Sequence, residues 1–185
     1  MRISAHYTLE VRDERGKLVR RIRRVSHSYV RATADWLHAT FGFSASTLVP
    51  DTGNVNRTMS TGSGTNGSGA NDADTNGLVV GTGTNAVALS DYALQTQITH
   101  GLGAGQLDYQ ATETAALQTV GSTRSFEIRR VFVNQSGATI TINECGQYVA
   151  YGALVFCFIR DVVSPGVAVP NNGSATLIYT LGVTV

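Results

Sequence analysis

The sequence has little cysteine, proline and lysine, and it contains no long apolar run. Its two cysteines, Cys145 and Cys157, form no CxxC pair and have no histidine at ligand spacing, which argues against a local zinc site. Buried free thiols are the favoured interpretation, and a disulfide between adjacent strands is the alternative. Because no segment approaches membrane-spanning length and the first residues lack a signal-peptide core, we expect synthesis in the cytoplasm and no membrane partner.

Motifs of the common enzyme classes are also missing from the sequence. There is no Gly-Lys-Ser/Thr for a P-loop and no GxSxG nucleophile elbow, and the four histidines lack HxH or HxxxH spacing. Residues 81–86 match GxGxxA after a strand-like run, but the helix and the acidic residue of a dinucleotide-binding unit do not follow. We therefore expect a non-enzymatic protein without a catalytic residue, a cofactor or a bound metal ion.

What the chain does contain, above all in its C-terminal third, is β-strand sequence interrupted by Gly and Asn turns. β-branched residues recur in 126–133 and dominate 138–143, and Asn134-Gln-Ser-Gly137 supplies the turn between them. This pattern predicts antiparallel strands over 125–133, 138–144, 149–160 and 174–185. Apolar residues alternate to the end of the last strand, so we expect that end to be held in the sheet.

The N-terminal residues predict a β-hairpin followed by one short α-helix. Apolar and polar residues alternate over 3–11, and a turn at 13–17 leads into a second strand-like run. Ser26 or Ser28 is suited to cap a helix that we expect to extend to about Phe41.

The middle of the chain is polar and poor in apolar residues. Gly, Ser, Thr, Asn and Asp dominate residues 44–76, which therefore offer little surface to bury. We predict three parts: a basic hairpin and helix in 1–43, an arm or loop in 44–77, and an antiparallel β domain in 78–185. The predicted fold class is mainly β, an antiparallel β-sandwich or jelly-roll-like domain with an N-terminal β-hairpin and one short α-helix.

Charge is distributed unevenly along the chain. Residues 1–31 contain nine of the fourteen Lys and Arg residues against three acidic residues, a balance of +6, whereas residues 32–185 contain five against ten, a balance of −5. The densest positive cluster lies on the predicted second strand, where alternation places two arginines on each face. The four arginines of this cluster are Arg20 and Arg24 on one face, and Arg21 and Arg23 on the other.

Three interpretations of the four arginines are open. They pair across the hairpin with Glu10, Asp13 and Glu14, they dock on an acidic surface of another protein, or they bind nucleic-acid phosphates. No aromatic residues are interleaved with them to stack on bases, so nucleic acid is the less favoured partner. Protein docking is therefore the functional hypothesis for this cluster.

Several segments of the chain resemble poorly characterised structural proteins of tailed bacteriophages. The resemblance rests on Ser28-Tyr-Val-Arg31, at the start of the predicted helix, and on five further segments. These segments are residues 77–85, 89–94, 132–146, 159–162 and 167–179. The resemblance implies a component of the virion, in the form of a capsid decoration, head-fibre, collar or tail protein.

The resulting hypothesis is a protein that self-associates into a ring or trimer and docks on other virion proteins through the four arginines and the polar stretch of 44–76. The alternative is a module of a phage tail or fibre that recognises the host surface or a glycan through its loops. For that alternative, the predicted contact residues are Tyr109, Asn134 and Gln135.

Overall fold

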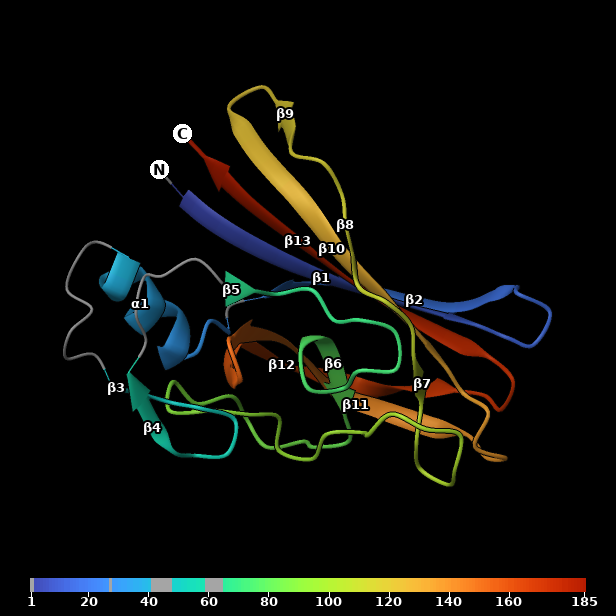
Figure 1. Ribbon diagram of the computed structural model, residues 1–185. Helices are drawn as coiled ribbons and strands as arrows, with labels where there is room; N and C mark the ends of the chain where they lie inside the picture. The colour runs from blue at the N-terminus through green and yellow to red at the C-terminus, as the bar shows by residue number, and fades with distance from the viewer. Residues whose placement is uncertain (1, 27, 41–47, 59–64) are drawn as a thin grey trace.

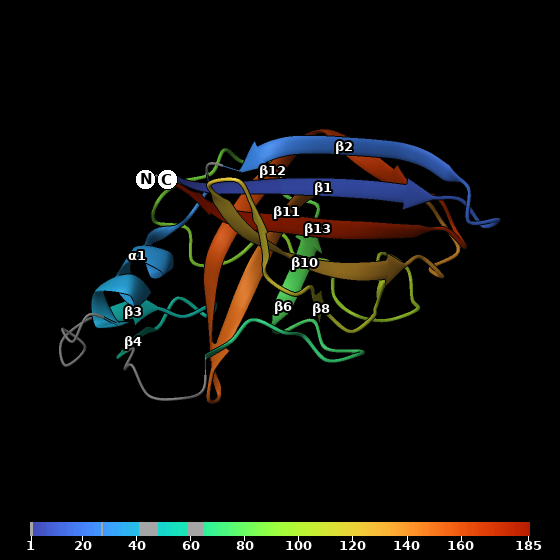
Figure 2. The ribbon, with the colours of Figure 1, turned by 90° about the horizontal axis from the view of Figure 1, so that it is seen from above.

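The computed structural model describes residues 2–26, 28–40, 48–58 and 65–185. Within these residues the chain forms two antiparallel sheets in a sandwich-like arrangement, a separate small hairpin and one α-helix (Figure 1). The predicted mainly β, antiparallel fold with an N-terminal strand pair and one helix is therefore confirmed. Figure 2 shows that the long strands of the two sheets cross one another and that both termini lie at the end of the molecule that carries the helix.

The larger sheet is built on four long strands in the order β2 (Leu18–Ser26), β1 (Arg2–Arg12), β13 (Ser174–Thr184) and β10 (Thr123–Val133). Three short strands line the far side of β10, namely β7 (Asp108–Tyr109), β8 (Glu113–Thr114) and β9 (Gln118–Val120). One edge of this sheet is therefore β2, and the other is the broken line of β7, β8 and β9.

Alternating apolar residues along β1 and β13 determine which face of the larger sheet is buried. Tyr7 lies opposite Tyr179 in the strand register, and both residues are at most 2% exposed. Successive side chains point to opposite faces, so the intervening polar and charged residues lie on the outer face. The predicted inner face of the last strand is confirmed at Tyr179, whereas Val183, further along the same face, is 40% exposed.

The smaller sheet consists of β12 (Leu154–Val169), β11 (Ile140–Tyr151), β6 (Gly77–Gly81) and β5 (Thr65–Asn66). β11 and β12 form a long hairpin, and both β6 and β5 pair with the other side of β11. The predicted break between residues 144 and 149 is wrong, because the strand continues through Gly146. A side chain at Gly146 would collide with the carbonyl of Ile159, so glycine here permits close strand packing.

The helix is shorter than predicted and begins without the expected serine cap. α1 spans Arg31–His38, with Val30 at its N-cap position and no side-chain cap bond. Residue 28 instead runs along the edge of β12, where the Ser28 carbonyl accepts a hydrogen bond from the Arg160 N–H. The chain therefore pairs with β12 before it turns into the helix. The predicted helix end at Phe41 lies outside the described residues.

The polar stretch of 44–77 lies on the sandwich wherever the structure describes it. β3 (Leu48–Pro50) and β4 (Asn56–Thr58) form the small hairpin. Residues 67–76 have no regular structure, but the guanidinium of Arg130, from β10, holds them through hydrogen bonds to three of their carbonyls. This part of the stretch is thus an anchored loop and does not extend away from the sandwich.

Candidate functional site

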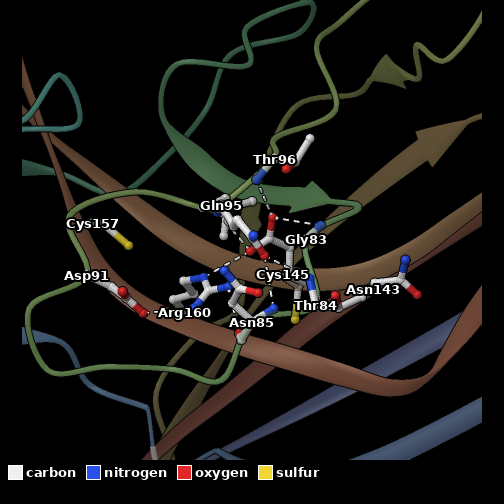
Figure 3. Close-up of polar contacts among 12 residues, drawn as sticks. Gly83, Thr84, Asn85, Asp91, Gln95, Thr96, Asn143, Cys145, Cys157 and Arg160 are labelled. Carbon is white, nitrogen blue, oxygen red and sulfur yellow. Dashed lines mark hydrogen bonds and ion pairs between the residues drawn. The ribbon is translucent and has the colours of Figure 1, made fainter.

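A buried polar network lies between the smaller sheet and the loop that follows β6, and Figure 3 shows several of its members, among them Asp91, Gln95 and Arg160. Glu144 of β11 is at the centre of this network. Its fully buried carboxylate accepts three backbone hydrogen bonds of 2.7–3.1 Å, donated by Gly83, Gln95 and Thr96. A fourth donor is Nε of Arg160 on β12, 2.9 Å away. All four contacts come from the protein itself, so the carboxylate acts as an internal anchor for the loop.

Arg160 extends this network from the neighbouring strand. Its side chain is 2% exposed and places Nη1 2.8 Å from Oδ2 of Asp91, while Nη2 donates to the carbonyl of Asn85. Burial by itself lowers the pKa of the Arg160 guanidinium, but hydrogen bonds to Asp91 and Glu144 outweigh that effect and raise the pKa above its ordinary value. The charged side chain therefore ties two strands and one loop together.

The GxGxxA match lies beside the same network and has a packing role. A side chain at either Gly81 or Gly83 would collide with the Glu144 carboxylate. The backbone N–H groups that a phosphate would need are occupied, since Gly83 donates to Glu144. The next two residues, 84 and 85, both donate to Oε1 of Gln95 at 2.9 Å. Glycine at these two positions therefore lets the backbone approach the buried Glu144 carboxylate closely.

Asp72, His100 and Asp108 are the group of potential metal ligands that the described residues bring together. Oδ1 of Asp72 lies 3.9 Å from Nε2 of His100, and Oδ1 of Asp108 lies 3.6 Å from Nδ1. However, Nδ1 accepts a hydrogen bond from the backbone N–H of Tyr109 at 3.2 Å, which places the proton of the neutral ring on Nε2. Neither ring nitrogen then offers a free lone pair to a metal ion, so the cluster anchors the loop before β7.

Two of the four arginines are engaged within the molecule. Nε of Arg21 lies 3.2 Å from Glu10 on β1, which confirms one predicted cross-strand partner. Nη2 of Arg24 donates to the carbonyl of Ser164 on β12 at 2.8 Å. The register with β1 also confirms that the cluster projects on both faces of the strand, because Arg24 lies opposite the inward-facing Tyr7 and Arg21 opposite Glu10.

The side chains of the other two, Arg20 and Arg23, are exposed and form no hydrogen bond or ion pair with any described residue. Asp13, a predicted partner, instead shapes the hairpin turn, where its Oδ1 accepts hydrogen bonds from the N–H groups of residues 15 and 17. We refer to Arg20 and Arg23 as the free arginines. They lie on the edge strand of the larger sheet, where a partner can reach them.

The three loop residues predicted for glycan contact do not form one site. Tyr109 is fully buried on β7 and donates its hydroxyl to the carbonyl of Ile98. Asn134 is also fully buried. Its side chain donates to the carbonyls of residues 138 and 169 and so organises the turn. Only Gln135 is exposed. Tyr109 and Asn134 are therefore structural, and the prediction that they contact a ligand is wrong.

The end of the sandwich that carries α1 is open and apolar. Two adjoining hollows of about 420 and 230 Å³ lie there and share Ile3 and Tyr29 in their walls. The other lining side chains are mostly apolar and include Trp36 and Leu37 in the larger hollow, and Leu117 and Phe126 in the smaller. We call the two hollows together the apolar cleft.

The apolar cleft exists because the larger sheet extends beyond the smaller one (Figure 1). Ile3 lies opposite Val183 at the ends of β1 and β13, on the face that is core elsewhere. Here that face has no covering strand among the described residues, so Ile3 is 58% and Val183 40% exposed. The opposite wall is α1, on which Leu37 is 41% exposed.

Sequence analysis did not identify the apolar cleft. The alternation in 3–11 and 177–185 shows which side chains share a face, but not how far the opposing sheet reaches along that face. The signal in the sequence was that the apolar alternation of the two strands includes Ile3 and Val183.

No protein-family model matches the chain, and comparison with curated proteins and with solved structures also finds no match. In the part of the chain that the structure describes, no helix is long and apolar enough to cross a membrane.

Proposed function

We propose that the protein is a non-enzymatic structural component of a bacteriophage virion, in the form of a capsid decoration, head-fibre, collar or tail protein. It self-associates and docks on other proteins of the particle. The sequence resemblance supplies the virion context, and the surfaces of the molecule supply the physical reason for assembly.

The observation that carries the proposal is the apolar cleft. Side chains such as Ile3 and Leu37 remain substantially exposed in the single chain, and covering apolar surface contributes roughly 25 cal/mol per Å². Contiguous exposed apolar surface on a folded domain is typical of an interaction site. A protein neighbour that covers this end of the sandwich completes a core that the described residues leave open.

The free arginines support the docking part of the proposal. Arginine forms paired hydrogen bonds with carboxylates and is common at fixed protein interfaces. Because Arg20 and Arg23 are not engaged within the described chain, their guanidinium groups are available to acidic residues of a neighbour. In this proposal, a neighbour makes hydrophobic contacts at the apolar cleft and charge contacts at the free arginines, which lie on separate surfaces.

The test is to locate the protein in purified particles of the phage that encodes it. Particles are banded on a density gradient, their proteins are identified by mass spectrometry, and the protein is labelled with antibody for electron microscopy. Stoichiometric recovery with intact particles and a fixed label position are expected. Absence of the protein from intact particles would reject the proposal.

Glycan or host-surface recognition has less support. The burial of Tyr109 and Asn134 removes two of the three residues predicted to contact the ligand, and Gln135 alone provides no stacking surface.

A further inference from the structure

We propose that two copies of the chain form a two-fold dimer in which their β9 strands pair edge to edge and each copy covers the mouth of the other's apolar cleft. This inference rests on the self-association in the proposed function and names its partner surface. The occupant of the apolar cleft is thus a second copy of the same chain.

Edge strand β2 and the segment around edge strand β9 differ in charge. The edge strand β2 carries four arginines in nine residues, and charges on an edge strand oppose pairing with another chain. The opposite edge, over residues 115–123, has no charged residue and no proline. All three residues of β9 are exposed, and the strand pairs only with β10 among the described strands. Its outer backbone groups are therefore free to pair.

The lack of charge at β9 favours a second copy over a different protein. A two-fold axis brings identical patches together, so any charge near the axis meets a like charge and is destabilising. No charged residue lies in the stretch that would pair, residues 115–123. The nearest charge is Arg124, which lies opposite Thr119 on β10, one strand back from the axis. The arginines of β2 would repel one another in the same arrangement.

The strand register connects this edge to the apolar cleft. Antiparallel pairing centred on Thr119 sets residue 120 of one copy opposite residue 118 of the other, and residue 121 opposite residue 117. Leu117 lines the cleft and is 57% exposed. The hairpin tip of the second copy therefore lies at the mouth of the cleft.

The exposed apolar side chains at this end fit such an interface. Val120 is 77% exposed and lies on the opposite face of β9 from Leu117. Val185 is 84% exposed, and its backbone N–H donates to the carbonyl of Ser122 at the hairpin tip. A stable interface buries about 800 Å² on each partner, more than a three-residue strand provides. The walls of the apolar cleft are the adjacent surface that can supply the remainder.

The test compares the solution mass of three full-length proteins by light scattering after size exclusion, over a concentration series. Wild-type protein is expected at twice the 19.6 kDa of one chain. Val120→Lys places like charges across the two-fold axis and is expected to weaken dimerisation at least about tenfold. The matched control is Val19→Lys on β2, a residue 52% exposed, which makes the same change at the other edge and should leave the dimer intact. Circular dichroism and thermal unfolding establish that each variant is folded.

A cross-linking experiment provides a positive signal. In Thr119→Cys the two introduced thiols face each other across the axis, within reach of a disulfide. The native Cys145 and Cys157 are fully buried free thiols, and burial raises the pKa of both, so the introduced thiol reacts first. A disulfide-linked dimer on a non-reducing gel is expected for Thr119→Cys and not for the control Val19→Cys.

Two outcomes would overturn this interface, and they are distinguishable. In the first outcome, wild-type protein self-associates, but Val120→Lys leaves the mass unchanged and Thr119→Cys does not cross-link. Self-association then stands but uses another surface. If wild-type protein is monomeric at every concentration and Thr119→Cys does not cross-link, both the interface and the self-association are rejected. The particle experiment still tests the virion assignment independently.

Discussion

The guanidinium carbon of Arg130 lies 4.8 Å from the centre of the Tyr109 ring, in the interior of the protein. Arg130 is fully buried, and its three nitrogens donate to five backbone carbonyls, those of residues 70, 73, 76, 78 and 110. Burial lowers the pKa of this guanidinium. The five carbonyls and the ring face supply the compensation that a buried cation requires, and three of these carbonyls belong to the polar loop of 67–76.

Replacing Arg130 by lysine should therefore destabilise the fold and release this loop. A lysine ammonium has three N–H donors, so at least two buried carbonyls lose their partners, at about 1–3 kcal/mol each. We expect a loss of about 2–5 kcal/mol in the free energy of unfolding, measured with urea, and faster hydrogen exchange in residues 67–78. The matched control is Arg129→Lys, where the side chain is 57% exposed and the change should stay within about 1 kcal/mol. Equal effects of the two substitutions would contradict the role assigned to Arg130.

The Glu144 and Arg160 pair provides a second prediction about stability. Glu144→Gln removes the charge that compensates a buried guanidinium and turns one acceptor oxygen into a donor facing other donors. Removing one partner of a buried pair typically costs about 3–5 kcal/mol, and we expect a loss in this range in urea unfolding. Glu113→Gln removes a carboxylate from the exposed pair with Arg129 and should cost at most about 1 kcal/mol. A Glu144→Gln protein as stable as the Glu113→Gln protein would refute the anchoring role.

The sequence predicted the strands well because their faces alternate. The pattern in 3–11 and 177–185 follows directly from burial of one side of a sheet, and the structure confirms it at Tyr7 and Tyr179. The break predicted near residue 146 was wrong because glycine is ambiguous: it marks a turn in one setting and close strand packing in another. Only the neighbouring strand, through the carbonyl of Ile159, distinguishes the two.

The surfaces were harder to predict than the strands. Placing two arginines on each face of β2 needed only alternation, but which arginines stay free depends on whether Glu10 and Ser164 lie within reach. Tyr109 was predicted as a loop contact because it follows the glycine-rich turn of 100–105, yet long-range packing places it in the core. The apolar cleft results from the unequal extent of two sheets, which no local pattern encodes.

Asp51 makes the β3–β4 hairpin sensitive to pH. Burial by itself raises the pKa of this carboxyl, but hydrogen bonds from the Val55 N–H, from Arg57 and from the Gly53 N–H, at 2.9–3.0 Å, outweigh it and lower the pKa. A group whose pKa is lowered by folding stabilises the protein above its unfolded-state pKa, about 3.9, and loses that effect as the pH falls through the folded-state value.

Asp51→Asn should therefore destabilise the protein by about 1–2 kcal/mol at neutral pH. The difference from wild type in urea unfolding should shrink as the pH is lowered below about 4. As a control, Asp35→Asn changes a carboxylate whose partner Arg31 is 52% exposed, and its effect should be small at neutral pH. A difference for Asp51→Asn that does not change with pH would show that the carboxylate charge is not the source of its effect.

The last prediction concerns docking through the free arginines. Changing all of Arg20, Arg21, Arg23 and Arg24 to serine should weaken docking on the particle, but it would also remove the contacts of Arg21 to Glu10 and of Arg24 to Ser164. The sharper comparison is between two double variants of equal charge. Arg20→Ser/Arg23→Ser removes only side chains that are free in the described structure, whereas Arg21→Ser/Arg24→Ser removes the two that are engaged.

Co-sedimentation with particles that lack the protein, at several salt concentrations, measures the docking affinity of each double variant. The first variant should bind several-fold more weakly at low salt and lose most of its salt dependence, because interface charges act through screened electrostatics. The second should keep that salt dependence and instead show a loss of unfolding free energy. If the first variant sediments like wild type at every salt concentration, the arginine edge is not a docking surface, and its charge serves only to keep β2 from pairing with other chains.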